Sequence, residues 1–196
     1  MLMLAIFLDQ ETTGLDPGRH RTIEIAFKII DVATDEVKTS YDAVVKLSSE
    51  AWSRHDPSSM QINGFTWETI SEGKELELVS SEIKNCFIQN GIERGKAVFI
   101  CQNPSFDRAF FNHLVSVDEQ EKLKWPYHWL DLASMYWATR MRKAKKDKTS
   151  FPEEIILSKD KIAEYYGLPP EKKPHKAMNG VDHLILCYQA LFNYKI

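Results

Sequence analysis

The chain has 196 residues, of which 43% are hydrophobic and 27% are charged, and its net charge is −3. This composition is typical of a soluble globular protein, and the length fits a single domain over residues 1–196. The small net charge excludes a strongly basic coat. Any contact with nucleic acid must therefore come from a local patch or through bound metal ions.

The cysteines and the N-terminal segment indicate the cellular compartment. Cys86, Cys101 and Cys187 are far apart in apolar surroundings, which fits reduced core thiols rather than a disulfide or zinc framework. The N-terminal residues are apolar, but no basic segment precedes them and the run is too short to span a membrane. We therefore expect a cytoplasmic protein that makes no contact with membranes.

Strands come first in the predicted order of elements. An apolar run over residues 3–8 predicts a buried strand, and alternation of apolar and polar residues predicts a half-buried strand over 22–31. A third strand is expected over 41–47. Because no helix is expected between these segments, they are predicted to form an antiparallel meander.

Helices and short strands alternate in the rest of the chain. Two further strands are expected over 97–101 and 127–130, and a charged loop is expected over 143–153. The expected helical segments cover 58–63, 75–90, 106–115, 132–143, 158–166 and 177–192. This order predicts an α/β fold with a mixed five-stranded sheet flanked by helices.

Two carboxylates stand at the end of the first strand with one residue between them. Asp9 and Glu11 point to the same face, because residues i and i+2 of a strand do so. Such a pair repels unless a cation lies between the two groups, and oxygen ligands suit Mg²⁺ or Mn²⁺. Two surface acids beside a turn are the simpler interpretation, and the rest of the chain decides between the two.

Three further polar residues lie at the starts of helices or just before them. Asp107 and Asp182 each stand in the first turn of an expected helix, where an acid commonly complements the helix dipole. His175 lies in a loop before the last helix, where a lone histidine is usually only solvated. Each residue taken alone therefore has an ordinary structural explanation.

Taken in order, these residues resemble the motifs of the DnaQ-like exonucleases. These form the DEDDh group of the ribonuclease-H-like superfamily, which includes the proofreading subunits of bacterial DNA polymerases. The segments that carry the resemblance are residues 9–11, 22–26, 62–66, 103–107, 129–131 and 175–182. They span nearly the whole chain. The resemblance implies a ribonuclease-H-like fold and a metal-dependent 3′→5′ exonuclease activity.

The resemblance also implies a role for each matching residue. Four acids would hold two divalent cations, Mg²⁺ or Mn²⁺, and they are Asp9, Glu11, Asp107 and Asp182. His175 would be the general base that deprotonates the attacking water.

The same resemblance implies a set of substrate-binding residues at the 3′-terminal nucleotide. This set consists of Thr12, Thr13, Gly14, Leu15, Phe65, Asn103 and Phe106. The backbone of residues 12–14 would face the nucleotide, Leu15 and Phe65 would wedge against the terminal bases, and the last two residues would shape the site.

The spacing after His175 departs from the family pattern. The family acid usually follows its histidine by five residues, but position 180 is glycine here and Asp182 follows by seven. The apolar stripe after Asp182 keeps the helical phase, which favours a loop that is two residues longer. The other interpretation is that the fourth ligand is missing and the enzyme is weak or inactive.

These inferences favour an exonuclease that degrades the 3′ end of single-stranded nucleic acid, with DNA preferred, to nucleoside monophosphates. One alternative is an oligoribonuclease or another enzyme that trims RNA 3′ ends. A second is a catalytically silent nucleic-acid-binding scaffold on the same fold. We expect either a free-standing exonuclease or one that associates loosely with a replicative polymerase. The sequence leaves the oligomeric state open.

A basic stretch over residues 136–148 adds a candidate contact surface. Aromatic residues at its start are followed by a run of lysine and arginine. Such a stretch is most often a solvated helix end, where cations are favoured. It also fits a partner- or membrane-binding helix or a guide for the phosphate backbone.

Overall fold

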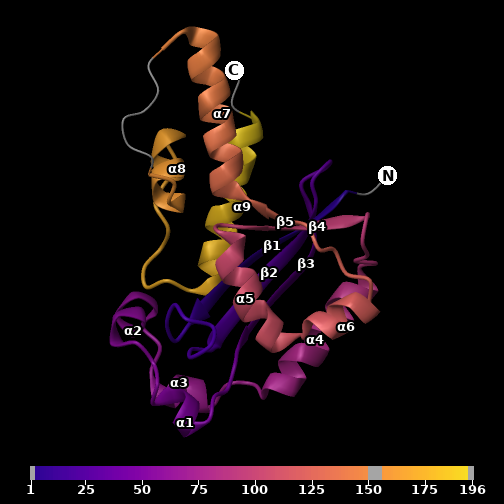
Figure 1. Ribbon diagram of the computed structural model, residues 1–196, viewed down its shortest axis with the longest axis vertical. Coiled ribbons are helices and arrows are strands. Elements are labelled where there is room, and N and C mark those ends of the chain that lie inside the picture. Colours follow the sequence, from indigo (N-terminus) through magenta and orange to yellow (C-terminus); the bar gives the residue numbers. More distant parts are fainter. Residues whose placement is uncertain (1–2, 150–155, 194–196) are drawn as a thin grey trace.

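The computed structural model describes residues 3–149 and 156–193 and contains one five-stranded mixed sheet (Figure 1). The strands are β1 (Leu4–Thr12), β2 (Thr22–Asp31), β3 (Glu36–Val44), β4 (Ala97–Cys101) and β5 (Trp129–Asp131). Their order is β3-β2-β1-β4-β5. The first three strands pair antiparallel, and β4 is parallel to both β1 and β5. The expected α/β fold with a meander followed by parallel strands is confirmed.

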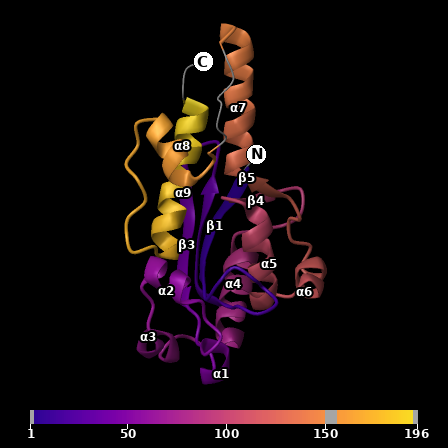
Figure 2. The same ribbon diagram turned by 60° about the vertical axis from the view of Figure 1, so that its left-hand side comes forward.

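Helices cover both faces of this sheet. They are α1 (Ser49–Trp52), α2 (Pro57–Asn63), α3 (Trp67–Ser71), α4 (Leu76–Gln89), α5 (Pro104–Leu114), α6 (Val117–Lys122), α7 (Leu132–Asp147), α8 (Lys159–Tyr165) and α9 (Ala177–Asn193). In Figure 2, α8 and α9 lie on one side of β1, and α4 and α5 lie on the other. None of the described helices combines the length and apolar character required to cross a bilayer.

Alternation along β1 decides which side chains face each layer. Leu4, Ile6 and Leu8 are buried in the core that includes α4 and α5. Ala5 and Phe7 are buried in the core that includes α8 and α9. Because alternate residues of a strand share a face, the odd-numbered acids that follow belong to the α8 and α9 side. The sheet thus presents its carboxylates to the last two helices.

Several boundaries differ from those expected. β1 continues to Thr12 because its ladder with β2 extends to the pair Thr12 and Thr22, so both acids lie inside the strand. β3 begins earlier than expected, because its first residues are exposed at the sheet edge and carry no apolar alternation. It also ends earlier than expected, at Val44. The short helices α1, α3 and α6 were not expected, although a capping box at Ser116 marks the start of α6.

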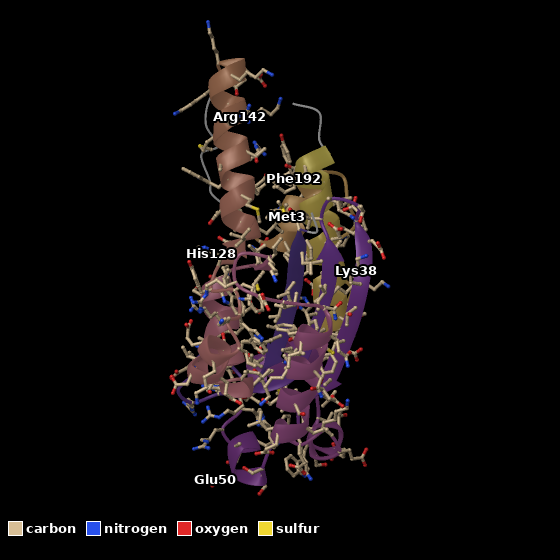
Figure 3. The ribbon with its side chains drawn as sticks, turned by 90° about the vertical axis from the view of Figure 1, so that its right-hand side faces the viewer. Met3, Lys38, Glu50, His128, Arg142 and Phe192 are labelled. Atoms are coloured by element: carbon tan, nitrogen blue, oxygen red, sulfur yellow. The ribbon has the colours of Figure 1, made fainter. Side chains whose placement is uncertain are left out.

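The helix α7 is longer than its apolar pattern indicates. It continues to Asp147, through part of the segment expected to be a loop. In Figure 1 its C-terminal half projects beyond the sheet, where a helix needs no apolar face. Arg142 lies near this free end, and Glu50 lies at the opposite end of the molecule (Figure 3).

Candidate active site

Three of the predicted acids line one cavity of about 220 Å³. Asp9 and Glu11 come from β1, and Asp107 lies in the first turn of α5, directly after β4. Because β1 and β4 are adjacent and parallel, their carboxyl ends bring the three acids together. A hydrogen bond supports this arrangement, since the side-chain Nε2 of Gln10 donates to the backbone oxygen of Asp107 at 2.8 Å.

The start of α5 is held by the neighbouring strand. Asn103 adopts the left-handed conformation, with φ of 58°, and Pro104 occupies the first turn. The backbone N–H of Asn103 donates to Asp131 Oδ1 at 3.1 Å, at the end of β5. Because of this sharp turn, the Asp107 side chain lies at the cavity. Phe106, which is half-buried, lines the same cavity.

Burial makes this cluster of carboxylates electrostatically unfavourable without a cation. Burial, followed by the charges of Asp9 and Glu24, raises the pKa of Glu11 to about 8. Burial and the charge of Asp9 also raise the pKa of Asp107 well above its ordinary value. The pKa of Asp9 is raised by burial too, although Lys159 opposes the effect. A positive charge near the three groups would relieve all these shifts.

A lysine side chain supplies such a charge. Lys159, the first residue of α8, has a side chain that is 13% exposed. Its Nζ lies 3.5 Å from Asp9 Oδ1, 3.0 Å from Glu171 Oε2 and 3.4 Å from the backbone oxygen of Gly180. Burial alone would lower the pKa of Lys159, but the carboxylates of Asp9 and Glu171 outweigh burial and raise it.

The structure does not bring Asp182 to this cluster, and we withdraw it from the ligand set. Its carboxylate pairs with Lys28 at 2.5 Å, and its side chain is 51% exposed. Position 180 faces the site instead, since a Cβ on Gly180 would overlap the Asp9 carboxylate. Two residues of a helix differ by about 200° in direction, so positions 180 and 182 point to opposite sides. Helix α9 begins at Ala177, as expected, and within it position 180 rather than position 182 faces the acids.

The expected general base lies at the cavity. His175 lines the cavity, and its side chain is 32% exposed. Its Nδ1 is 3.8 Å from Glu171 Oε1, and its backbone N–H donates to the oxygen of Ile62 at 3.1 Å. The nearby His183 is buried on α9, and its Nε2 contacts the backbone oxygen of Pro169 at 3.0 Å. His175 is therefore the more accessible of the two.

Two residues that were expected to contact the substrate instead contact other parts of the protein. Thr13 is buried, its N–H donates to the oxygen of Arg21, and its own oxygen accepts from Asp56. Phe65 is only 5% exposed, and the ammonium of Lys176 lies 3.4 Å from its ring centroid. In this structure the backbone of Thr13 and the ring of Phe65 are engaged by other parts of the chain, and their roles at the nucleotide stay predictions.

The neighbouring positions differ in how accessible they are. Leu15 is 76% exposed, as a wedge residue requires. The hydroxyl of Thr12 donates to the oxygen of Gly14 at 2.8 Å. A Cβ on Gly14 would lie 2.5 Å from the ring of His20, so glycine is needed for this close approach. The loop after β1 thus exposes one apolar side chain next to the acids.

A family model for exonucleases, RNase_T, matches residues 6–185. The chain belongs to this exonuclease family. The match confirms the family resemblance that the sequence motifs indicated. Among curated proteins, a PolC-type DNA polymerase III of Thermotoga petrophila is 28% identical over 175 residues. The aligned region covers 89% of this chain and 11% of the polymerase.

Solved structures of nucleases share the fold of this exonuclease-family chain. Cell-death related nuclease 4 (CRN-4) matches with a TM-score of 0.74 and 18% identity, over 98% of this chain and 64% of that one. The zinc-ion-bound complex of E. coli exonuclease I with single-stranded DNA matches with a TM-score of 0.72 and 16% identity. That match covers 99% of this chain and 43% of exonuclease I. The chain therefore spans only part of each of these proteins.

The chemistry of the cavity suits a divalent cation, because Asp9, Glu11 and Asp107 provide the oxygen donors that Mg²⁺ or Mn²⁺ prefers. Asp182, which was expected as the fourth ligand, lies outside the cavity, whereas Glu171 and Lys159 line it. Within residues 3–149 and 156–193, no group of three or more His, Cys, Asp or Glu side chains is arranged to hold a metal ion. The two-ion set expected from the resemblance is therefore not assembled.

Sequence reasoning missed two of the residues at this site, Lys159 and Glu171. A weak signal existed for the lysine, because it follows the N-cap Ser158, where the helix dipole disfavours a cation. Glu171 follows two prolines in a loop and carries no local signal. Its carboxylate is buried, and Oε1 has no hydrogen-bond partner among the described residues. Only the tertiary arrangement reveals these two side chains.

Proposed function

We propose that this chain is a metal-dependent 3′→5′ exonuclease that degrades single-stranded DNA to nucleoside monophosphates. The observation that carries the proposal is the convergence of Asp9, Glu11, Asp107 and His175 on one cavity. Membership in an exonuclease family supports the reaction class. Single-stranded DNA in the exonuclease I structure supports the choice of substrate.

The roles of the residues follow from their chemistry. The three acids supply oxygen ligands, and a divalent cation held by them would generate a nucleophile near neutral pH and offset charge on the phosphate. His175 accepts a proton from water at Nε2, because its Nδ1 faces Glu171. The Glu171 carboxylate, 3.8 Å from Nδ1, stabilises the imidazolium that results. Leu15 stacks against the terminal base.

The test is release of mononucleotides from 5′-labelled single-stranded DNA and RNA of equal length. The parent should shorten DNA from the 3′ end with Mg²⁺ or Mn²⁺ and stop on chelation. Asp107→Asn should abolish release, and His175→Ala should slow it by about 10²- to 10⁴-fold. Asp118→Asn, a change of an exposed acid on α6, is the matched control. Undiminished release by Asp107→Asn would refute the proposal.

Two alternatives give different results in the same assay. Faster shortening of RNA than of DNA would identify an oligoribonuclease or another enzyme that trims RNA 3′ ends. A silent scaffold is favoured by the glycine at position 180 and by the lysine within the cavity. It would bind the labelled oligonucleotides without releasing nucleotides under any metal condition.

The similarity to a PolC-type DNA polymerase III supports a proposed association with a replicative polymerase. Co-elution of the full chain with such a polymerase in size-exclusion chromatography would support this association. Separate elution at micromolar concentrations would contradict it.

A further inference from the structure

Lys159 places a positive charge within the cavity where the family resemblance predicts metal ions. Its ammonium group has three N–H donors, and three acceptors surround it at 3.0 to 3.5 Å. Two of these acceptors are carboxylates and the third is a backbone oxygen. Removing a lysine from water is unfavourable unless its charge is compensated, and here the compensation comes from Asp9 and Glu171. The contacts therefore hold the charge beside one of the predicted metal ligands.

Gly180 and Lys159 depend on each other sterically. A Cβ on Gly180 would overlap the Asp9 carboxylate and would lie 3.0 Å from Lys159 Nζ. The space for a side chain at position 180 is thus taken by Asp9 and the ammonium group. A side chain at position 180 would require the Asp9 carboxylate to move, and its contact with Lys159 Nζ would be tight.

We propose that Lys159 replaces one of two divalent cations, so that the site binds a single Mg²⁺ or Mn²⁺ and uses the ammonium group as its second positive charge. The inference rests on the proposed function of this site. The cavity is lined by the carboxylates of Asp9, Glu11, Asp107 and Glu171, which carry four negative charges when ionised. One divalent cation and one ammonium group offset three of them.

The position of Lys159 also defines what it does during the reaction. It lines the cavity together with Phe106 and His175. An ammonium group is a compact point charge that suits phosphate oxygens. Lys159 holds the Asp9 carboxylate in place and places positive charge where the phosphate enters. No proton leaves its Nζ in this role, so it is a positioning and charge-balancing residue.

The first measurement is the number of Mn²⁺ ions bound per full-length chain, from electron paramagnetic resonance of free Mn²⁺. We expect one ion for the parent and for Lys161→Met, a change of an exposed lysine on the same helix. We expect Lys159→Met to bind Mn²⁺ more tightly than the parent, because the competing positive charge beside Asp9 is removed. Two ions of similar affinity in the parent would overturn the inference.

The second measurement separates a charge role from a purely structural one. Lys159→Met should lower kcat by about 10²-fold, as for loss of a preorganised charge, with little change in KM. Lys159→Arg, which keeps the charge, should recover part of that loss. Equal kcat for the parent and Lys159→Met would overturn the inference. Thermal unfolding verifies that each variant is folded.

The two proposals fail in different ways. A parent that binds one Mn²⁺ but releases no nucleotide with any metal contradicts the exonuclease function and supports the single-ion site. A parent that degrades DNA and binds two Mn²⁺ supports the function and contradicts the role of Lys159.

Discussion

Glu11→Gln should stabilise the metal-free protein by an amount that increases with pH. Burial and the charges of Asp9 and Glu24 raise the pKa of Glu11 from 4.5 to about 8. The ionised carboxylate is therefore less favourable in the folded chain than in the unfolded chain. The stability associated with the protonated group is fully present below about pH 4.5 and is lost as the pH rises toward about 8. At about 1.4 kcal/mol per pKa unit, the loss is about 3 kcal/mol at pH 7 and about 5 kcal/mol at pH 9.

Urea denaturation in EDTA at about pH 4.5 and about pH 9 measures this difference. Glutamine does not ionise, so the variant should match the parent at the acid pH and exceed it in free energy of unfolding at the alkaline pH. Glu72→Gln, a change of an exposed acid, is the control and should show no pH-dependent gain. With saturating Mn²⁺ the parent should have the higher free energy of unfolding, because Glu11→Gln lacks one of the ligands that bind the ion. A gain that is equal at both pH values, or larger at the acid pH, would refute this reasoning.

Two further predictions concern residues outside the cavity. Asp182→Asn should leave Mn²⁺ binding and nucleotide release within about twofold of the parent and cost at most about 1 kcal/mol of stability, because its surface ion pair is exposed. A Mn²⁺ titration checks this, and a lost binding site would restore Asp182 as a ligand. Lys145→Ala with Lys146→Ala, at the exposed end of α7, should weaken oligonucleotide binding and reduce its salt slope by at most about 1.4. Binding measured from low to high salt checks this, and unchanged affinity would exclude a guiding role for this end.

The parts of the fold that follow backbone periodicity were predictable. The bounds of β2 and β4 are those expected from their apolar patterns. Strand geometry predicted that Asp9 and Glu11 share a face, and the family resemblance added Asp107, which lines the same cavity. These features depend on residues close in sequence, or on the rule that adjacent parallel strands end at one edge of a sheet.

The start of α9 at Ala177 was expected, but a contact with no local sequence signal holds this helix start on the sheet. Glu24 Oε2 on β2 accepts a hydrogen bond from the backbone N–H of Ala177 at 2.7 Å, across 153 residues of chain. This bond fixes the helix start, and with it the direction of positions 180 and 182. The apolar stripe that favoured Asp182 does not show which of positions 180 and 182 faces the acids. Sequence spacing alone correctly marked position 180 as unusual.

The strict alternation of β1 also constrains how this protein can change over evolutionary time. Inserting or deleting one residue between Leu4 and Asp9 would exchange the two faces of the strand. Carboxylates would then enter the apolar layer beneath α4, and leucine side chains would enter the cavity. A single such event would remove core and site together. Homologous chains should therefore keep the number of residues in β1 constant.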